Sequence, residues 1–308
     1  MPIKGIVLLQ NMLIRIAKTF KKALFPTRCL VCGSFFNPNQ HKICDVKPGP
    51  TDTDNSNLVQ EFIKKIVSTS TRDIYYLDNI HNIFNELMTP FLCSTCTSGF
   101  LPVESPKCSR CGMMFKSRQG EDHLCGECLD STKRFQMARS VGIYKDTLMA
   151  MIHCFKYKGK IQLSRPLGTL LFLAFVSFWD QMNIDLIVPV PLHSKKLRMR
   201  GFNASFLLIK DWGDMAKFLN VRLPDMPVDT HVLTRKRWTD PQTGLGRKER
   251  LKNIKNVFKI SDGSKINGKR ILIVDDVYTT GATVNECARV LLKGGAGRVD
   301  VLTLARAI

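Results

Sequence analysis

The chain has 308 residues, and its hydrophobic content of 44% excludes a chain too polar to bury a core. It is strongly basic: 46 Lys and Arg residues against 26 Asp and Glu residues give a formal net charge of +20 at pH 7. Such an excess favours anionic partners, whether phosphorylated metabolites, nucleic acid or acidic lipid, without choosing among them. The length allows two domains or one large domain with an appendage.

The N-terminal segment, residues 1–28, predicts an amphipathic helix, because basic residues are interspersed among regularly spaced apolar residues. No small-residue cleavage site follows it, so we do not expect a secretory signal peptide. The favoured interpretation is a helix that packs on the next domain. A helix that lies on a membrane surface is the alternative.

Four Cys-x-x-Cys pairs follow, each with the spacing of a metal-binding knuckle. Two such pairs bind one tetrahedral zinc ion, which favours a reducing, cytoplasmic environment over a secreted disulfide framework. The last two pairs are separated by 13 residues and predict a four-cysteine ribbon, whereas 60 residues separate the first two, whose pairing is less certain. The expected zinc ligands are Cys29, Cys32, Cys93, Cys96, Cys108, Cys111, Cys125 and Cys128.

The long interval predicts a helical insertion at about residues 37–90, within a double zinc ribbon that spans 29–135. Its first part is rich in Pro, Gly, Asp and Asn, which is typical of a loop. From Leu58 to Leu87 the apolar residues recur at helical spacing. Cys44 and His41 lie in the insertion and are either further metal ligands or, more simply, an uncoordinated thiol and a surface imidazole.

From residue 139 onward, strand patterns alternate with helix patterns, which predicts an α/β fold for the domain expected at 136–308. The apolar stretch 167–179 is too short to cross a bilayer and predicts a buried helix, so we expect no membrane span. The expected strands are 141–144, 184–191, 271–274 and 299–305, and the expected helices are 147–155, 167–179, 202–218 and 283–293.

The most informative segment is Ile271–Thr283, with the sequence Ile-Leu-Ile-Val-Asp-Asp-Val-Tyr-Thr-Thr-Gly-Ala-Thr. An apolar run that ends in two carboxylates, Asp275 and Asp276, is typical of a buried parallel strand at the ligand edge of an α/β sheet. The loop after it offers backbone N–H groups and hydroxyls to a phosphate. The string resembles the phosphoribosyl pyrophosphate (PRPP) motif of type I phosphoribosyltransferases. The simpler alternative is a buried strand with an acidic turn and a Thr-capped helix.

Two basic segments accompany this motif in the chain. Residues 191–203 contain four cations in six positions before a glycine, a composition suited to pyrophosphate oxygens. Residues 234–253 are rich in Arg, Lys and Gly and predict a mobile lid over an anionic substrate. Either segment alone is more simply a solvated basic loop, but their place in the chain around the PRPP-type motif favours the functional interpretation.

From Cys29 to Ile308 the chain resembles the ComF-type proteins of bacterial competence, a family of predicted amidophosphoribosyltransferases. The matching strings are Cys29-Leu30-Val31-Cys32-Gly33, Lys156-Tyr157-Lys158-Gly159, Val188-Pro189-Val190-Pro191-Leu192-His193, Arg200-Gly201-Phe202-Asn203, Gln242-Thr243-Gly244-Leu245, Arg247-Lys248-Glu249-Arg250, the later cysteine pairs and the 271–283 motif. The resemblance implies a zinc-ribbon head fused to a type I phosphoribosyltransferase domain and a role in DNA uptake during natural transformation.

The resemblance also implies a role for each residue of the motif. Asp275 and Asp276 would contact the ribose 2′- and 3′-hydroxyls, and Mg²⁺ would bridge the diphosphate. The 5′-phosphate loop would consist of Thr279, Thr280, Gly281, Ala282 and Thr283. The pyrophosphate side would be lined by Lys195, Arg198 and Arg200, and Lys156 would touch the acceptor.

Three functions fit these residues. The first is a DNA-uptake protein that binds PRPP and holds single-stranded DNA, alongside competence helicase or DNA-processing partners, with exposed aromatics such as Phe202 or Trp238 stacking on bases. The second is an active phosphoribosyltransferase that transfers to an amine or base, although neither Met1 nor Pro2 supplies the cysteine of a self-contained glutaminase. The third, a zinc-dependent scaffold without ligand, leaves the 271–283 motif unexplained.

Overall fold

The computed structural model describes residues 27–38, 72–131, 133–179, 184–218, 227–238 and 253–308. Three predictions lie wholly or largely outside them: the N-terminal helix, the first part of the insertion with Cys44 and His41, and most of the basic lid. Residues 27 and 28, which the predicted N-terminal helix includes, form a strand instead.

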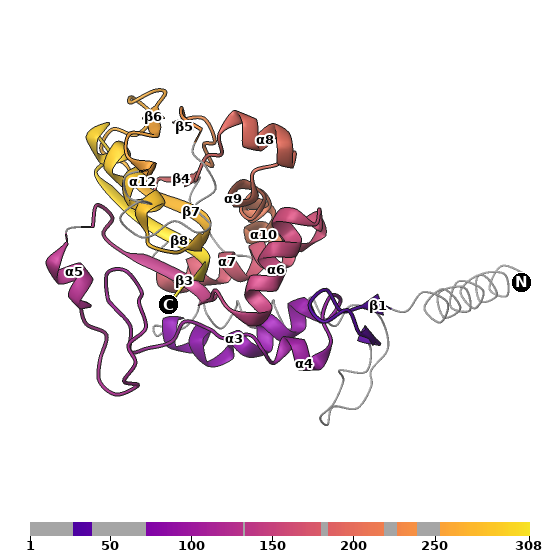
Figure 1. The fold of residues 1–308 in the computed structure, drawn as a ribbon. Coiled ribbons are helices and arrows are strands. Elements are labelled where there is room, and N and C mark those ends of the chain that lie inside the picture. The colour runs from indigo at the N-terminus through magenta and orange to yellow at the C-terminus, as the bar shows by residue number, and fades with distance from the viewer. Residues whose placement is uncertain (1–26, 39–71, 132, 180–183, 219–226, 239–252) are drawn as a thin grey trace, which may run out of the picture.

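The centre of the molecule is a four-stranded parallel sheet in the order β3-β8-β7-β4 (Figure 1). The strands are β3 Ala138–Ile143, β4 Leu186–Pro189, β7 Arg270–Tyr278 and β8 Arg298–Arg306. Most positions of β7 and β8 are buried, as expected of middle strands that are covered on both faces. The predicted α/β class is thereby confirmed. The central strand is longer than the predicted 271–274 and continues through both carboxylates.

Alternate residues of β7 point to opposite faces of the sheet and enter two different cores. Leu272 and Val274 pack with α7, α6 and α3 on one face. Ile271 and Ile273 pack on the other face with α12 and the last four cysteines of the head. The helices are α3 Arg72–Met88, α6 Asp146–Tyr157, α7 Ser164–Phe178 and α12 Ala282–Lys293. The cysteine-rich region therefore packs on both faces of the sheet.

Helix α7 follows a short 3-10 turn, η2 Ile161–Leu163. Together, residues 161–178 are long and apolar enough to cross a membrane by length and composition alone, a longer stretch than the 167–179 considered from the sequence. Most of the segment is buried inside the protein, where α7 packs against α3, β3 and β8. A buried core helix accounts for its composition.

The basic segment 191–203 forms a helix, α8 Ser194–Arg200, where the sequence predicted a loop. Gly201 ends α8 at φ 83°. The single helix predicted over 202–218 is divided into α9 Ala204–Leu207 and α10 Trp212–Phe218. This division lets the indole of Trp212 donate to the carbonyl of Gly168 in α7 at 3.3 Å, a tertiary contact that helical periodicity does not encode.

Two short antiparallel pairs lie outside the main sheet. In one, β1 Thr27–Arg28 pairs with β2 Phe35–Phe36, and in the other, β5 Leu233–Arg235 pairs with β6 Phe258–Ile260. Two short helices carry cysteines of the head, α4 Ser94–Thr97 and α5 Gly126–Asp130. Within the expected insertion, α3 packs on α7 and contributes Tyr76, Ile80 and Phe84 to the core.

Candidate functional site

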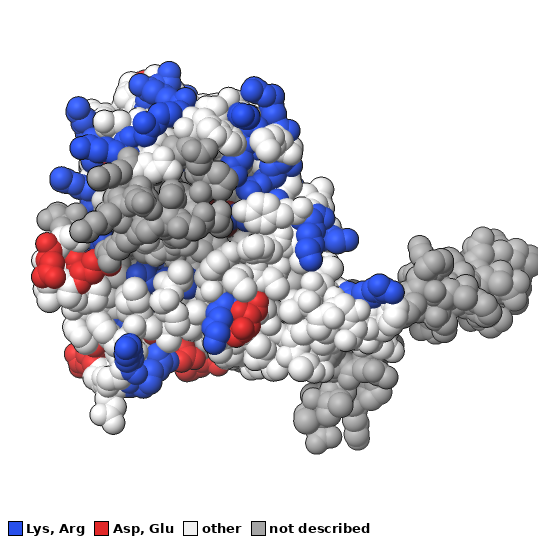
Figure 2. Space-filling model, viewed as in Figure 1, with Lys and Arg blue, Asp and Glu red and all other residues white. Residues whose placement is uncertain are grey.

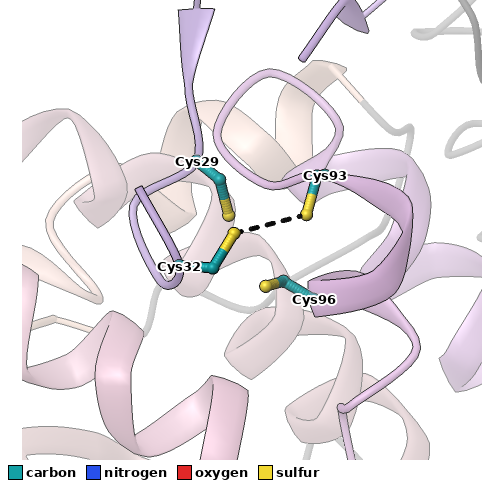
Figure 3. A group of neighbouring side chains, drawn as sticks. All are labelled: Cys29, Cys32, Cys93 and Cys96. Atoms are coloured by element: carbon teal, nitrogen blue, oxygen red, sulfur yellow. Dashed lines mark hydrogen bonds between the residues drawn. The ribbon is translucent and has the colours of Figure 1, made fainter. Parts of the chain in front are cut away.

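The eight predicted ligand cysteines form two four-cysteine groups, and within each group the sulfur atoms lie within 4.8 Å of one another. Cys29, Cys32, Cys93 and Cys96 form the first centre, in which the side chains point toward a common point (Figure 3). Cys108, Cys111, Cys125 and Cys128 form the second centre. The structure thus pairs the two distant knuckles, which sequence spacing left uncertain.

The sulfur spacing in both centres fits zinc. The Sγ atoms of Cys32 and Cys93 are 3.7 Å apart, as are those of Cys111 and Cys125. Four sulfurs about 2.3 Å from a tetrahedral zinc ion are separated by about 3.8 Å. A disulfide needs about 2.05 Å, and the cysteines of both centres are free. The donor set is that of a structural zinc ribbon.

In the second centre, backbone N–H groups favour a thiolate at Cys108. The N–H groups of Cys111 and Cys125 each donate to Cys108 Sγ at 3.4 Å. Hydrogen bonding by the Cys111 side chain lowers the pKa of Cys108 most; burial opposes it, and the backbone donors add to the lowering, which leaves the pKa at about 3. A thiolate is the form that binds a metal ion.

Asp275 and Asp276 lie side by side in the second half of β7. Asp275 Oδ1 accepts hydrogen bonds from the Ser205 hydroxyl and from the backbone N–H of Asp276, both at 2.9 Å. Asp276 Oδ2 forms an ion pair with Lys156 Nζ at 2.6 Å, and both side chains are largely buried. Helix α6 therefore brings Lys156, a predicted acceptor contact, directly onto the carboxylate pair.

Burial and the neighbouring charge of Asp276 shift the pKa of the Asp275 carboxyl group. Burial, helped by the charge of Asp276 and opposed by Lys156, raises the pKa of Asp275 to about 7. Burial alone would lower the pKa of Lys156, but the charge and hydrogen bond of Asp276 outweigh it and raise the pKa. The site thus holds a stable ammonium–carboxylate pair beside a carboxyl group that titrates near neutral pH.

The predicted phosphate loop joins β7 to α12, with Gly281 as the residue before the helix. Gly281 has φ 73°, and a Cβ there would lie 2.2 Å from the hydroxyl oxygen of Tyr278, so the position requires glycine. The Thr280 hydroxyl accepts from the N–H of Ala282 at 3.4 Å. Thr279, Thr280 and Thr283 stay partly exposed at the start of this 12-residue helix, where N–H groups attract anions.

Cations surround this edge of the sheet, but not all are those predicted. Lys196 is partly buried, and burial followed by the charges of Arg200, Arg235 and Lys156 lowers its pKa. Burial lowers the pKa of Arg235, and the negative charge of Asp275 across the site opposes this shift. The sequence singled out neither Lys196 nor Arg235 as a site residue. Lys196 belongs to the cation-rich string that the sequence revealed, but only the helical geometry of α8 shows which of the cations in that string is turned inward.

The three cations of α8 that the sequence predicted for the site differ in exposure. Lys195 is exposed, with its Nζ 5.0 Å from the centroid of the Trp238 ring. Arg200 is partly buried and lies 5.0 Å from the centroid of the Tyr157 ring. Arg198 is exposed. The lid residues Gln242, Arg247, Lys248, Arg250 and Lys252 lie outside the described residues.

Comparisons with known proteins agree with this geometry. Residues 215–308 match the family model described as a phosphoribosyl transferase domain. The chain is 32% identical over 221 residues to the DNA utilization protein YhgH of Escherichia coli, a match that covers 70% of this chain and 91% of the relative. It is 31% identical over 240 residues to competence protein F of Haemophilus influenzae, with 77% and 97% covered. Competence protein ComFC of Bacillus subtilis is 28% identical over 222 residues, with 70% and 84% covered.

Proposed function

This chain belongs to the family of competence protein F and the DNA utilization proteins, and we propose that it binds PRPP with Mg²⁺ and acts in DNA uptake, where it also holds single-stranded DNA. The observation that carries the proposal is the meeting of Asp275 and Asp276 with the Gly281 loop at one edge of the sheet. Lys156, Lys196 and Arg235 bring positive charge to the same edge.

Each part of PRPP has a chemical counterpart in this arrangement. The carboxylates of Asp275 and Asp276 accept hydrogen bonds from the ribose hydroxyls, and the loop of residues 279–283 holds the 5′-phosphate. The diphosphate recruits Mg²⁺, which prefers oxygen ligands and neutralises the charge that the basic residues do not. Because Asp276 is paired with Lys156, this ammonium stays beside the ribose when PRPP binds.

Isothermal titration of Mg²⁺–PRPP tests the site. We expect Asp275→Asn and Asp276→Asn to weaken binding by at least about tenfold each, since each loses a charge-assisted hydrogen bond. Asp130→Asn is the matched control, because Asp130 is an exposed carboxylate at the end of α5. Failure of the wild type to bind, or equal binding by all variants, would contradict the proposal.

The proposed DNA surface adjoins this site. Figure 2 shows Lys and Arg gathered over the end of the molecule that carries α8, β5 and β6. Two aromatic rings there have cations beside them: Tyr157, 63% exposed, with Arg200, and Trp238 with Lys195. Bases stack on such rings while phosphates meet the cations. Phe202, predicted to stack, packs instead on Phe155 at 5.6 Å, and Tyr157 takes its place in the proposal.

Fluorescence anisotropy with a labelled single-stranded oligonucleotide tests this surface. We expect affinity to fall steeply with salt, because each neutralised phosphate releases counterions. Tyr157→Ala is expected to weaken binding by about 1–3 kcal/mol, that is by about fivefold to 150-fold. Phe35→Ala is the matched control, because Phe35 is 58% exposed with Arg28 over its ring but lies on β2, away from α8. An oligonucleotide affinity that changes neither with salt concentration nor in Tyr157→Ala would contradict the proposed DNA surface.

A second candidate function is catalytic transfer of the phosphoribosyl group to an unknown amine or base in nucleotide metabolism. The observation that favours it is the Asp275 carboxyl, whose pKa of about 7 suits proton transfer near neutral pH. In this reaction the bond from ribose C1 to the diphosphate breaks, a C–N bond forms, and the nucleophile gives up a proton. Pyrophosphate release in a screen of amines and nucleobases, absent in Asp275→Asn, would establish it; release without any acceptor would indicate hydrolysis instead.

Three further assignments are part of the proposal. The chain is divided into an amphipathic segment at 1–28, a double zinc ribbon at 29–135 and a phosphoribosyltransferase-like domain at 136–308. The protein is cytoplasmic, consistent with zinc-binding thiols in a reducing environment. Its protein partners are helicase or other DNA-processing proteins of the competence system, and co-purification of such proteins from competent cells tests that assignment.

A further inference from the structure

Arg306, at the end of β8, makes a direct contact with the second cysteine centre. Its Nη1 donates to the carbonyl oxygen of Cys111 at 2.6 Å, and its Nη2 donates to Cys111 Sγ at 3.5 Å. The residue is only 2% exposed. A buried guanidinium that donates to both the backbone and the sulfur of one ligand fixes that ligand from outside the centre.

The same guanidinium contacts the strand that carries the proposed PRPP site. Its central carbon lies 4.2 Å from the centroid of the Tyr278 ring. Tyr278 and Arg306 are paired in the register of β7 and β8, and the N–H of Ala307 donates to the carbonyl of Tyr278 at 2.9 Å. The Tyr278 hydroxyl in turn occupies the space that a Cβ at Gly281 would need. Contacts therefore continue from Cys111 through Arg306 and Tyr278 to the phosphate loop.

Charge explains why Arg306 is held there. A buried cation is costly unless an anion compensates it. Arg306 takes part in none of the ion pairs with carboxylates found among the described residues. Four thiolates around one Zn²⁺ carry a net charge of about −2, so the loaded centre supplies that anion.

We propose that Arg306 is a positioning residue that couples metal binding at the second centre to the shape of the phosphate loop. The inference rests on the proposed function for the identity of the ligand, but the contact itself does not. Because coupling between two binding sites is reciprocal, a phosphate ligand must alter the second centre as the metal alters the loop. The Cys29 centre lacks an arginine of this kind among the described residues and serves as an internal reference.

Cadmium NMR of the full chain loaded with Cd²⁺ provides the test, since each four-cysteine centre gives its own resonance. Cys32→Ser and Cys128→Ser, each of which disrupts one centre, assign the two signals. The ligand-free arm compares the wild type with Arg306→Lys and Tyr278→Leu. Arg298→Lys is the matched control, because Arg298 also lies on β8 but pairs with Asp300.

In the ligand-free arm we expect Arg306→Lys and Tyr278→Leu to move the resonance of the second centre and to leave that of the first in place. Among the described residues no hydrogen bond joins Tyr278 to a cysteine, whereas its ring lies against the guanidinium of Arg306, so we expect its effect to reach the second centre through Arg306. A second-centre resonance that is the same in wild type and Tyr278→Leu would overturn the proposal, even if Arg306→Lys failed to fold.

In the second arm Mg²⁺–PRPP is added, and its affinity is measured in parallel by titration. We expect the second resonance to move in the wild type and in Arg298→Lys, and the affinity to fall about tenfold in Arg306→Lys. A wild type that binds PRPP without moving this resonance would refute the coupling. A wild type that does not bind PRPP would refute the proposed function, while the ligand-free arm still decides whether the relay exists.

Discussion

The two cysteine centres share a ligand set and sulfur spacing but are attached to the rest of the protein in different ways. The first centre contacts α6 through neutral groups: the Thr147 hydroxyl donates to the Cys96 carbonyl at 2.5 Å, and Cys154 Sγ donates to the Leu30 carbonyl at 3.5 Å. The second centre is contacted at a ligand sulfur itself, by Arg306. Two centres with the same metal-binding motif can therefore be coupled to the fold to different degrees. The coupling is closer where a ligand sulfur itself is contacted by a residue of the sheet.

Loss of one ligand from each centre gives the largest expected difference. Cys108 is fully buried in the core beneath the sheet, whereas Cys32 is exposed. We expect Cys108→Ser to lower Tm by roughly 10 °C or more, because metal binding is coupled to the folding of that core. Cys32→Ser should lower Tm by only about 2–4 °C, or roughly 1 kcal/mol. Calorimetry measures the two Tm values, and metal analysis measures the zinc content of each variant. If both variants lose the same amount of metal and show the same decrease in Tm, the two centres do not differ in their contribution to stability.

The glycine that follows each first knuckle offers a matched pair. Gly33 has φ 76°, and a Cβ added there would meet nothing within 4 Å, so Gly33→Ala should cost only the backbone strain, about 1–2 kcal/mol. Gly112 has φ 71°, but a Cβ there would lie 2.9 Å from the backbone oxygen of Ala138. Gly112→Ala should therefore cost clearly more, about 3 kcal/mol.

Denaturant unfolding of the two alanine variants measures that difference. Because both glycines lie in the left-handed region, their conformational penalties cancel and the remainder reports the contact between the second centre and β3. A Gly112→Ala variant as stable as Gly33→Ala would contradict a close contact between Gly112 of the second centre and the Ala138 carbonyl at the start of β3.

The pH dependence of PRPP binding is expected to report Asp275 at the edge of the sheet and not the two cysteine centres. Asp275 has a pKa of about 7 in the free protein, and sugar hydroxyls donate to its ionised form. Binding must therefore displace a proton below that pH, so affinity should rise with pH by up to about tenfold per unit and level off above it. Titrations in two buffers of different ionisation enthalpy count the proton. In Asp275→Asn only the pH dependence of the ligand itself should remain; an unchanged slope would contradict this role.

The smallest expected effect concerns α3, the helix that leads to the second knuckle of the first centre. The Tyr76 hydroxyl is buried without a hydrogen-bond partner among the described residues. Tyr76→Phe should therefore leave the free energy of unfolding unchanged or raise it by up to about 1 kcal/mol. Tyr144→Phe, which removes a hydroxyl bonded to His153, should lower it slightly. A loss of stability in Tyr76→Phe would show that its hydroxyl is bonded after all.

Local sequence patterns predicted the parts of the site that lie on one strand and its following loop. Asp275, Asp276 and Gly281 are close in the chain, so their placement follows from the strand, the turn and the helix that they begin. The choice among basic residues was not predictable in this way. Lys196 rather than Lys195 or Arg198 is turned inward because α8 forms a helix, and Arg235 comes from a separate antiparallel pair.

Short-range periodicity and spacing were enough to predict the α/β class and the eight cysteines, and the PRPP-type motif followed from its resemblance to type I phosphoribosyltransferases. Tertiary structure alone decided which distant knuckles meet, that Lys156 pairs with Asp276, and that Arg306 joins the second centre to Tyr278. Most of these contacts link residues far apart in the chain, 61 positions between Cys32 and Cys93 and 195 between Cys111 and Arg306. No local pattern encodes them, since they arise only when the sheet and its two covering layers have packed.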